Sequence, residues 1–203
     1  MARNIEQNYP VLKADTLNDP VIFVVDMVNG FIFEGALHDE AIHDITPNIQ
    51  SLMESLECRN VFVCDSHPPK TREFDAYPAH CVIGTSEAEV IDDLRPYIKW
   101  MIHKNSTNTF TAPEFQSFLE QEMNRYRDII ITGCCTDLCI LQFALSLQAW
   151  LNEHNKTKMR IIVPADCVET YHIEGVHDAG YWNTAALENM RINGIDVVSK
   201  IME

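Results

Sequence analysis

Three side chains that could act together in catalysis lie at or just beyond the ends of predicted strands. Asp26 closes the apolar run 20–26, and Lys104 closes the run 97–104. Cys139 stands near the start of a helical pattern, where free backbone N–H groups and the helix dipole favour a thiolate. Asp26 could accept the thiol proton, and Lys104 could stabilise the thiolate. Each residue alone is commonplace, but together they predict a cysteine nucleophile.

A second group of side chains has the chemistry of metal ligands. The stretch DSHPPKTREFDAYPAH offers two carboxylates and two imidazoles, from Asp65, His67, Glu73 and His80. An Asp-x-His pair at a strand end can place both ligands on the same side of the strand. This set suits a borderline divalent metal, with water in the remaining positions. On spacing alone, a polar loop with solvated histidines is the alternative.

The elements that position these residues alternate between apolar runs and helical patterns. Strands are predicted at 20–26, 60–65, 97–104, 128–133, 160–166 and 195–201, and helices at 44–58, 86–94, 113–124, 136–154 and 176–192. Ser86 and Glu89 resemble a capping box for the second helix. The alternation predicts a mainly parallel sheet with helices on both faces. In such folds the ligand site lies beyond the carboxyl ends of the strands, where Asp26, Asp65 and Lys104 fall.

The bulk composition fits one domain, 1–203, and narrows the classes of partner. A net charge of −15 disfavours nucleic acid and anionic membrane surfaces as partners. The segment MARNIEQNYP lacks the apolar run of a signal peptide, and no segment is apolar for long enough to span a bilayer. The odd count of seven cysteines favours free thiols. We therefore expect a cytoplasmic protein.

The three reactive residues carry a resemblance to a known family. Asp26 in VVDMVNGF, Lys104 in HKNSTNTF and Cys139 in TGCCTDLCI resemble the signatures of the isochorismatase-like cysteine hydrolases, in the same order. The resemblance implies a Rossmann-like, three-layer α/β/α sandwich and a triad that forms a thioester with an amide carbon and releases ammonia. It also implies a non-proline cis peptide between Cys134 and Cys135. The backbone N–H groups of Cys135 and Cys139 would form the oxyanion hole.

The metal-ligand stretch resembles the nicotinamidase branch of this family. YPAHCVIGT (77–85) is similar to the motif W/F-P-P-H-x-x-x-G-T, and Glu73 stands where a histidine is common. The resemblance implies one divalent ion, with zinc expected first and iron or manganese next, which binds a pyridine nitrogen and orients the ring. Tyr77 stands at an aromatic position of the substrate slot. Phe31 and Phe110 resemble its other aromatics, although core packing would equally explain them.

The main hypothesis is therefore a nicotinamidase-like amidohydrolase, which converts nicotinamide to nicotinate and ammonia in NAD salvage. The first alternative is another small-amide or ureido hydrolase of the same superfamily. The second is a catalytically silent binding module. The expected partner is a small-molecule amide, and a homo-oligomer remains open. His172 and His177, in the unusual segment 171–182, are interpreted as loop histidines; that segment could be a lid, an oligomer contact or a surface connector.

Overall fold

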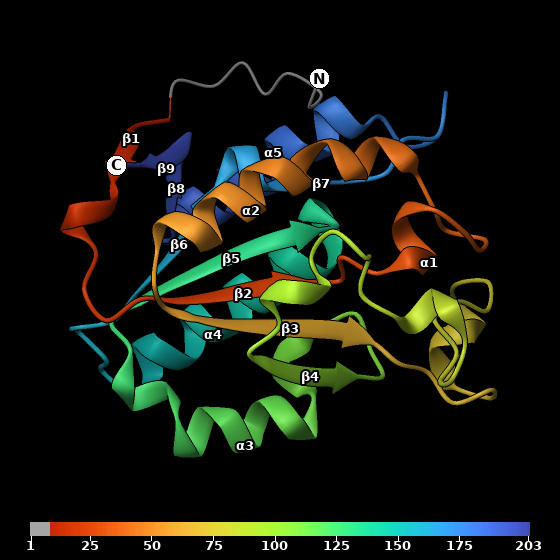
Figure 1. Ribbon diagram of the computed structural model, residues 1–203, viewed down its shortest axis with the longest axis horizontal. Coiled ribbons are helices and arrows are strands. Elements are labelled where there is room, and N and C mark those ends of the chain that lie inside the picture. The colour runs from red at the N-terminus through yellow and green to blue at the C-terminus, as the bar shows by residue number, and fades with distance from the viewer. Residues whose placement is uncertain (1–8) are drawn as a thin grey trace.

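The central feature of the computed structural model is a parallel sheet, which Figure 1 shows with its arrows running in one direction. The structure describes residues 9–203. Residues 1–8 lie outside the described part; they belong to the predicted domain and to the N-terminal segment that lacks a signal-like apolar run. The six strands in spatial order are β4 (Trp100–Lys104), β3 (Arg59–Asp65), β2 (Val21–Val25), β5 (Asp128–Cys134), β6 (Arg160–Pro164) and β8 (Asp196–Val198). The short strand β7 (Val168–Glu169) pairs with the end of β5. Two further strands, β1 (Val11–Lys13) and β9 (Lys200–Met202), form a separate parallel pair.

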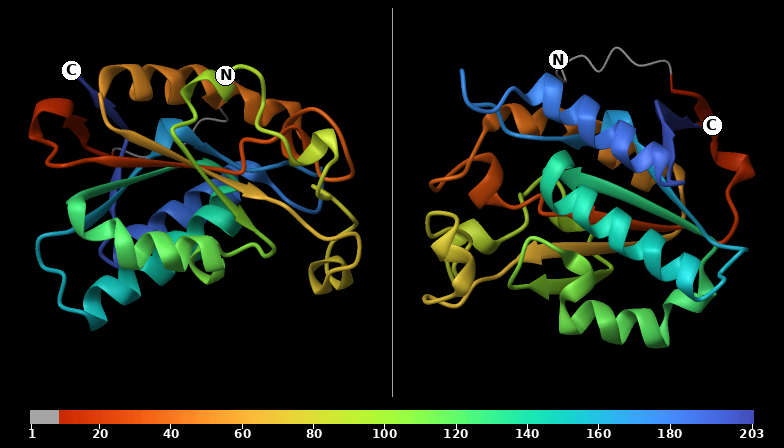
Figure 2. Two further views of the ribbon diagram at one scale, coloured as in Figure 1. Left: turned by 60° about the horizontal axis from the view of Figure 1, so that its bottom comes forward. Right: turned by 180° about the vertical axis from the view of Figure 1, so that it is seen from behind.

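Helices cover both faces of this sheet, as Figure 2 shows. One face packs against α2 (Thr46–Ser55), with the single-turn α1 (Asn29–Ile32) near the strand ends. The other face packs against α3 (Pro113–Gln121), α4 (Leu141–Glu153) and α5 (Ala179–Ile192). The predicted three-layer α/β/α sandwich is confirmed.

Strand β2 shows why the sheet needs cover on both sides. All five of its residues are fully buried, and alternate side chains enter opposite cores. Phe23 points toward α3 and α4, where its ring meets Phe115, Phe118 and Phe143 edge-on at centroid distances of 5.9, 5.6 and 5.3 Å. These aromatic contacts fix the two helices on the sheet.

The chain changes direction across the sheet between β2 and β5. From β2 it builds outward through β3 to β4, then returns to β5 and builds the other way through β6 to β8. Such a switch point leaves a crevice at the carboxyl ends of the two central strands. The two strands approach closely at Gly133, where a Cβ atom would lie 2.0 Å from the Val25 carbonyl oxygen. Only glycine fits there, and its φ of +109° also favours glycine.

Two predicted elements differ from the structure. The predicted helix 86–94 is wrong: it contains only a 3-10 turn, Ser86–Ala88, and no side-chain cap forms. The apolar residues of this stretch are buried in an extended conformation instead, and Val90 forms a β-bridge with Val28. Tertiary packing therefore overrides the helical spacing. The predicted strand 195–201 splits, because its last residues turn away from β8 to pair with β1.

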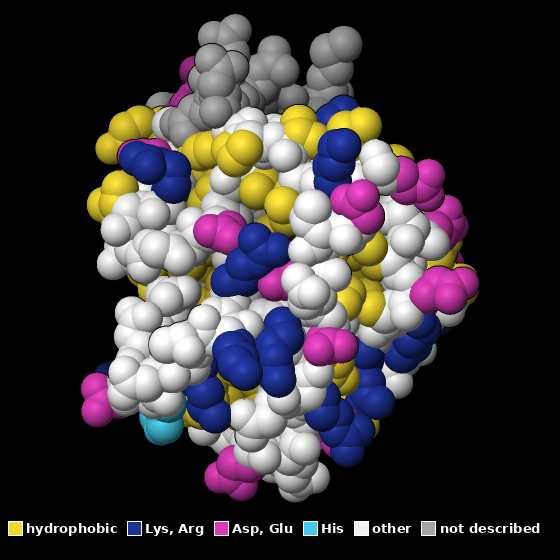
Figure 3. Space-filling view, turned by 90° about the vertical axis from the view of Figure 1, so that its left-hand side faces the viewer, with side chains coloured by type: hydrophobic (Ala, Val, Ile, Leu, Met, Phe, Trp, Pro, Cys, Tyr) yellow, Lys and Arg dark blue, Asp and Glu magenta, His cyan; other side chains and the backbone are white. Residues whose placement is uncertain are grey.

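The face at the beginning of the strands has a different character. Figure 3 views this end, where Lys and Arg side chains gather although the chain is acidic overall. Arg59 begins β3 and Arg160 begins β6, so the basic side chains lie at the opposite end of the sheet from Asp26 and Lys104. Among the described helices, none has the length and apolar character needed to cross a membrane.

Candidate active site

Three of the reactive side chains meet at the carboxyl ends of adjacent strands. Asp26 follows β2, Asp65 ends β3 and Lys104 ends β4. The Lys104 Nζ atom lies 2.8 Å from Asp26 Oδ2 and 2.5 Å from Asp65 Oδ1. Asp26 has a φ of 54°, in the left-handed region that aspartate, asparagine and glycine tolerate best. The backbone thus turns sharply to aim this carboxylate at the ammonium.

Cys139 reaches the same point from the segment after β5, on the other side of the switch point between β2 and β5. It lies in a π-helical turn, Thr136–Ile140, between β5 and α4, and its Sγ atom lies 3.8 Å from Lys104 Nζ. Ligand atoms of Asp26, Asp65 and Cys139 all lie within 4.8 Å of one another. The structure therefore brings Asp26, Lys104 and Cys139 into one buried cluster.

Burial sets the protonation states in this cluster. Burial raises the pKa of the Asp26 carboxyl to about 6, against the opposing pull of Lys104. Burial also raises the pKa of the Cys139 thiol well above its usual range, and Lys104 offsets only part of this rise. Burial therefore opposes the thiolate that the helix end is predicted to favour. The arrangement sets the thiol beside a carboxylate that can accept its proton.

Lys104 remains charged although it is buried. Burial alone would lower the pKa of its ammonium, but the carboxylates of Asp26 and Asp65 outweigh that effect and raise the pKa well above its usual range. A second link joins the two acids, because the Asp65 N–H donates a 2.9 Å hydrogen bond to Asp26 Oδ1. One cation and two anions thus form a single hydrogen-bonded unit beside the thiol.

The peptide bond between Cys134 and Cys135 is cis, as the resemblance implies. The Cys134 thiol donates to the Asp26 carbonyl oxygen at 3.1 Å. The Cys135 carbonyl accepts hydrogen bonds from the N–H groups of Leu138 and Ile140 at 3.1 and 3.2 Å. The Cys134 side chain and Cys135 carbonyl are therefore engaged in holding the turn, which leaves Cys139 as the thiol facing Lys104.

Three of the four predicted metal ligands converge. The Nε2 atoms of His67 and His80 lie 3.6 and 3.7 Å from Asp65 Oδ2. Each ring's Nδ1 faces an oxygen, that of Asn105 Oδ1 for His67 and that of the Pro78 carbonyl for His80, both at 2.8 Å. With the Nδ1 proton donated there, each Nε2 lone pair faces Asp65.

The donor set fits a divalent ion. His67 Nε2 is buried and has no hydrogen-bond partner among the described residues, which is costly unless another group binds it. Two neutral imidazoles and one carboxylate are suitable ligands for a borderline metal. Glu73, the fourth predicted ligand, lies apart from this group: its Oε1 accepts hydrogen bonds from the Thr107 N–H and hydroxyl at 3.2 and 2.5 Å.

Two cavities beside the cluster share part of their lining. An inner cavity of about 30 Å³ is lined by side chains that include Asp65, Glu73, His80 and Cys139. An outer cavity of about 500 Å³ lies against it. The residues that line both are Phe31, Leu37, Tyr77, Cys135 and Leu138.

The three predicted aromatic residues of the slot occupy different places. The rings of Phe31 and Tyr77 lie 5.5 and 6.2 Å from the His80 ring, at the cavities. Phe110 instead packs 5.7 Å from Phe115 against the core and is absent from the described linings of both cavities.

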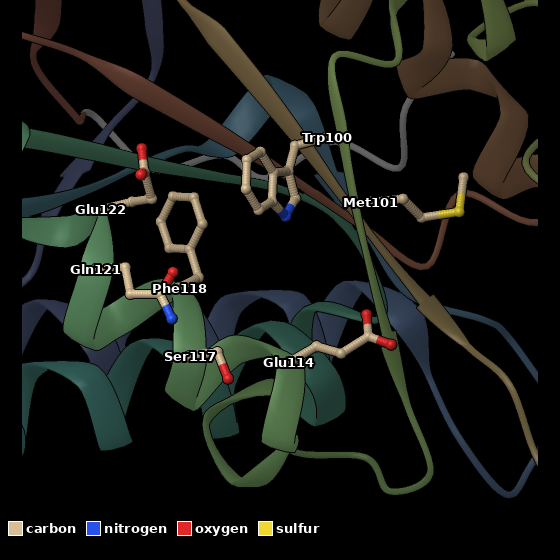
Figure 4. A pocket seen from close by; sticks show the side chains of 7 residues that line it. All are labelled: Trp100, Met101, Glu114, Ser117, Phe118, Gln121 and Glu122. Carbon is tan, nitrogen blue, oxygen red and sulfur yellow. The ribbon is translucent and has the colours of Figure 1, made fainter.

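A separate groove lies at the edge of the sheet. It has a volume of about 390 Å³ and is formed between strand β4 and helix α3, as Figure 4 shows. Its floor includes Trp100 and Phe118, and its polar groups include Glu114 and Glu122. Its described lining contains no thiol or imidazole.

Sequence reasoning missed several residues at the site. Asn105 orients His67 and also accepts a hydrogen bond from the Thr71 hydroxyl at 2.9 Å. Its position directly after Lys104 was the available signal. His177, interpreted above as a loop histidine, is buried and faces Asp137 of the turn Thr136–Ile140, with Nε2 2.8 Å from Asp137 Oδ2. No spacing pattern in the sequence links those two residues.

Solved structures share this fold. The structure of PnC1 from L. infantum in complex with nicotinate has a TM-score of 0.73 at 19% identity and covers 96% of this chain and 100% of that one. Pyrazinamidase of Pyrococcus horikoshii in complex with zinc gives 0.68 at 23% identity, over 89% of this chain and 99% of that one. N-carbamoylsarcosine amidase from Thermoplasma acidophilum gives 0.68 at 24% identity, over 89% and 96%. At these identities, the TM-scores show a shared fold and nothing more.

Sequence comparison narrows the relationship further. Nicotinamidase 1 of Arabidopsis thaliana is 27% identical over an alignment of 146 residues, and the match covers 60% of this chain and 57% of that protein. The match therefore spans little more than half of that relative. The family model for the isochorismatase domain matches residues 20–197, a range that contains Asp26, Lys104 and Cys139. Because that match covers most of the chain, the protein belongs to the isochorismatase family, as its three signatures predict.

Proposed function

We propose that this protein is a cysteine amidohydrolase that converts nicotinamide to nicotinate and ammonia. The observation that carries the proposal is the position of Lys104, whose Nζ lies 2.8 Å from Asp26 and 3.8 Å from the Cys139 thiol. Asp65 joins this group to the two histidines, because its Oδ1 binds Lys104 and its Oδ2 faces His67 and His80. The 27% identity to a nicotinamidase of Arabidopsis thaliana supports the same substrate.

In the first step, Asp26 accepts the proton of the Cys139 thiol as Sγ attacks the amide carbon. The carbonyl π electrons move to oxygen, and the backbone N–H groups of Cys135 and Cys139 are the proposed donors to that oxyanion. Asp26 then returns the proton to the amide nitrogen, the C–N bond breaks and ammonia leaves. The product of this step is a thioester on Cys139.

In the second step, Asp26 removes a proton from water, and the resulting hydroxide attacks the thioester carbon. The C–S bond breaks, Sγ recovers the proton and the carboxylic acid is released. Lys104 stays protonated throughout, because two carboxylates flank it. Its charge holds Asp26 in place and offsets negative charge that develops on sulfur.

The same proposal assigns one divalent ion to Asp65, His67 and His80. Glu73, the predicted fourth ligand, would have to turn its carboxylate away from Thr107 to join them. Zinc is the first choice and iron or manganese the next, and the pyrazinamidase structure from Pyrococcus horikoshii that contains zinc supports this order. When bound, such an ion supplies a Lewis acid that can hold a pyridine nitrogen. Phe31 and Tyr77 stand beside His80, where an aromatic ring would lie between them and the ligands. Phe110 is the weakest assignment, because its ring packs on Phe115.

The test compares nicotinamide, pyrazinamide and benzamide by kcat/KM under one condition, with and without a chelator. Benzamide matches nicotinamide in shape but has no ring nitrogen. A site built around a polar contact discriminates strongly against an analogue that lacks it. We expect the two ring-nitrogen amides to be hydrolysed, benzamide to be nearly inert, and the chelator to abolish the difference. Equal values for nicotinamide and benzamide in the metal-loaded protein would mean that the metal does not read the ring nitrogen, and the assignment would give way to a broader small-amide hydrolase.

A second candidate is hydrolysis of a larger amide or ureido compound. The outer cavity of about 500 Å³ favours it, since His38, Glu40 and His172 there could contact a polar substituent. The shared fold with an N-carbamoylsarcosine amidase is compatible with such chemistry. A panel of ureido compounds, assayed for ammonia release, separates this candidate from the first. A silent binding module is disfavoured by the intact contacts of Lys104, and it predicts no release from either panel.

Release of nicotinate would give the protein a role in pyridine nucleotide synthesis, by salvage of nicotinamide for NAD. The free state of all seven cysteines supports a reducing compartment such as the cytoplasm. Fractionation of cells with an antibody to the protein checks that location. Sedimentation of the purified protein determines whether it forms a homo-oligomer.

A further inference from the structure

The segment 171–177, called the strap below, is bound to the turn that carries the nucleophile. Ile173 and His177 close it, with backbone hydrogen bonds of 2.9 and 2.8 Å in both directions. Tyr171, His172 and Ile173 form part of the wall of the outer cavity. The proposed chemistry assigns the strap no role, yet it includes a buried histidine.

The His177 ring is held from four directions. It stacks on Tyr171 at a centroid distance of 3.9 Å with planes 13° apart, and on Trp182 at 5.4 Å with planes 9° apart. Its Nδ1 lies 2.9 Å from the Tyr171 carbonyl oxygen, and its Nε2 lies 2.8 Å from Asp137 Oδ2. Both oxygens are acceptors, so a ring that carries both protons donates to both at once.

Asp137 is the connection to the reacting thiol. It lies in the turn Thr136–Ile140, two residues before Cys139, and its side chain is only 6% exposed. Its other oxygen, Oδ1, accepts a 2.5 Å hydrogen bond from the Thr170 hydroxyl. The carboxylate is therefore fixed at both oxygens by groups outside the turn. The backbone hydrogen bonds of the turn itself run to the Cys135 carbonyl. The two contacts of the Asp137 carboxylate, called the clamp below, therefore connect the turn to the strap.

We propose that His177 is a positioning residue for Cys139, acting through Asp137. His177 does not touch the thiol; it fixes the side chain that orients the turn, and with it the direction of Sγ and of the backbone N–H groups of Cys135 and Cys139. The inference rests on the proposed function only in taking Cys139 as the reacting thiol. A small displacement of a nucleophile is sufficient to slow its reaction substantially.

Two substitutions separate the ring's contacts. In His177→Gln the side-chain amide nitrogen can replace Nε2 and still donate to Asp137. In His177→Asn the shorter amide can replace Nδ1 alone and leaves Asp137 without that donor. The readout is the rate at which iodoacetamide alkylates Cys139, followed by peptide mass mapping, which needs neither nicotinamide nor metal. We expect His177→Asn to lower that rate by roughly 10- to 100-fold and His177→Gln to stay within about threefold of native.

A matched control and a second variant complete the test. Val176→Ala changes the exposed neighbour in the strap and should react like the native protein. Asp137→Asn keeps the size of the side chain but removes its charge, so it should slow alkylation even where His177→Asn fails to fold. Adding His177→Gln to Asp137→Asn should cause no further loss, because both act through one contact.

Two outcomes would overturn the proposal. Equal rates in His177→Asn and His177→Gln, whether native or slow, would show that the Asp137 contact does not set the reactivity of Cys139. A native rate in Asp137→Asn would have the same meaning. Either result would leave the proposed amidase reaction untouched, whereas the absence of ammonia release with normal alkylation would contradict the reaction and not the clamp.

Discussion

Lys104 is a buried cation between two buried carboxylates, and replacing it with methionine removes the charge that balances them. Its Nζ lies 2.8 Å from Asp26 and 2.5 Å from Asp65. Methionine has a similar length and fills the same space, so no large cavity results. What changes is the charge: the native unit holds one positive and two negative charges, while Lys104→Met leaves the two buried carboxyl groups without a cation.

The expected loss follows from that geometry. Removing one partner of a buried ion pair destabilises a protein by about 3–5 kcal/mol, because the other charge stays buried without compensation. At roughly 2–4 °C per kcal/mol for a chain of this size, the melting temperature should fall by about 6–20 °C. Activity should also be nearly lost, since Asp26 and the thiolate lose their cation.

Asp26→Asn provides the matched control, because it lowers activity by a different route. It leaves one positive and one negative charge in the cluster. Asparagine tolerates the φ of 54° at this position, and its Oδ1 can still accept from the Asp65 N–H. The amide nitrogen then replaces Oδ2 beside Lys104 Nζ and cannot accept its hydrogen bond. Stability should therefore fall, but less than in Lys104→Met because the remaining charges balance, while the loss of the general base lowers kcat by roughly 100-fold or more.

The assay is thermal unfolding of both variants and the double variant in the presence of a chelator, which keeps any metal from compensating Asp65. The double variant Lys104→Met/Asp26→Asn should regain part of the stability lost in Lys104→Met, because one of the uncompensated charges is gone. Equal melting temperatures for the native protein and Lys104→Met, or a larger loss in Asp26→Asn than in Lys104→Met, would refute the charge balance described here.

Three further predictions concern the metal, the other thiols and the sheet. Asn105→Ala frees the His67 ring and should weaken metal binding by roughly 10- to 100-fold, measured by competition with a coloured chelator; unchanged affinity would deny Asn105 that role. Burial raises the pKa of Cys58 to about 11, so its thiolate forms only as the pH rises, and its alkylation rate should increase about tenfold per pH unit between pH 8 and 10; a flat profile would contradict this. Gly133→Ala would place a Cβ atom 2.0 Å from the Val25 carbonyl oxygen and should greatly lower the yield of folded protein, whereas a native melting temperature would show that β2 and β5 can move apart.

The sequence was informative where chemistry coincides with strand ends. A continuous apolar run of five to seven residues is easily recognised as a buried strand, and parallel strands all end at one edge. Asp26, Asp65 and Lys104 could therefore be placed together before any coordinates were known. The loop between Asp65 and His80 was harder, because three of its four candidate ligands converge while Glu73 binds Thr107 instead.

The remainder depends on contacts between distant segments. Val90 and its neighbours have helical spacing but are buried as an extended segment, since Val28, just before α1, provides the partner for a β-bridge. His177 lies 40 positions from Asp137 and has no periodic relation to it, so only the fold brings them together. Local patterns can identify an element and its buried face, but they cannot identify the partner across the core.

The central claim is that Cys139 forms a thioester with the acyl part of an amide substrate. The direct measurement is to quench the metal-loaded protein in acid during turnover of nicotinamide and to locate any acyl group within its peptides by fragmentation mass spectrometry. We predict a nicotinoyl group on the peptide that contains Cys139, present in the native protein and absent from Cys139→Ala, which should release no ammonia above background. Turnover of nicotinamide by Cys139→Ala, or an acyl group on Cys134 or Cys135 instead, would contradict the account.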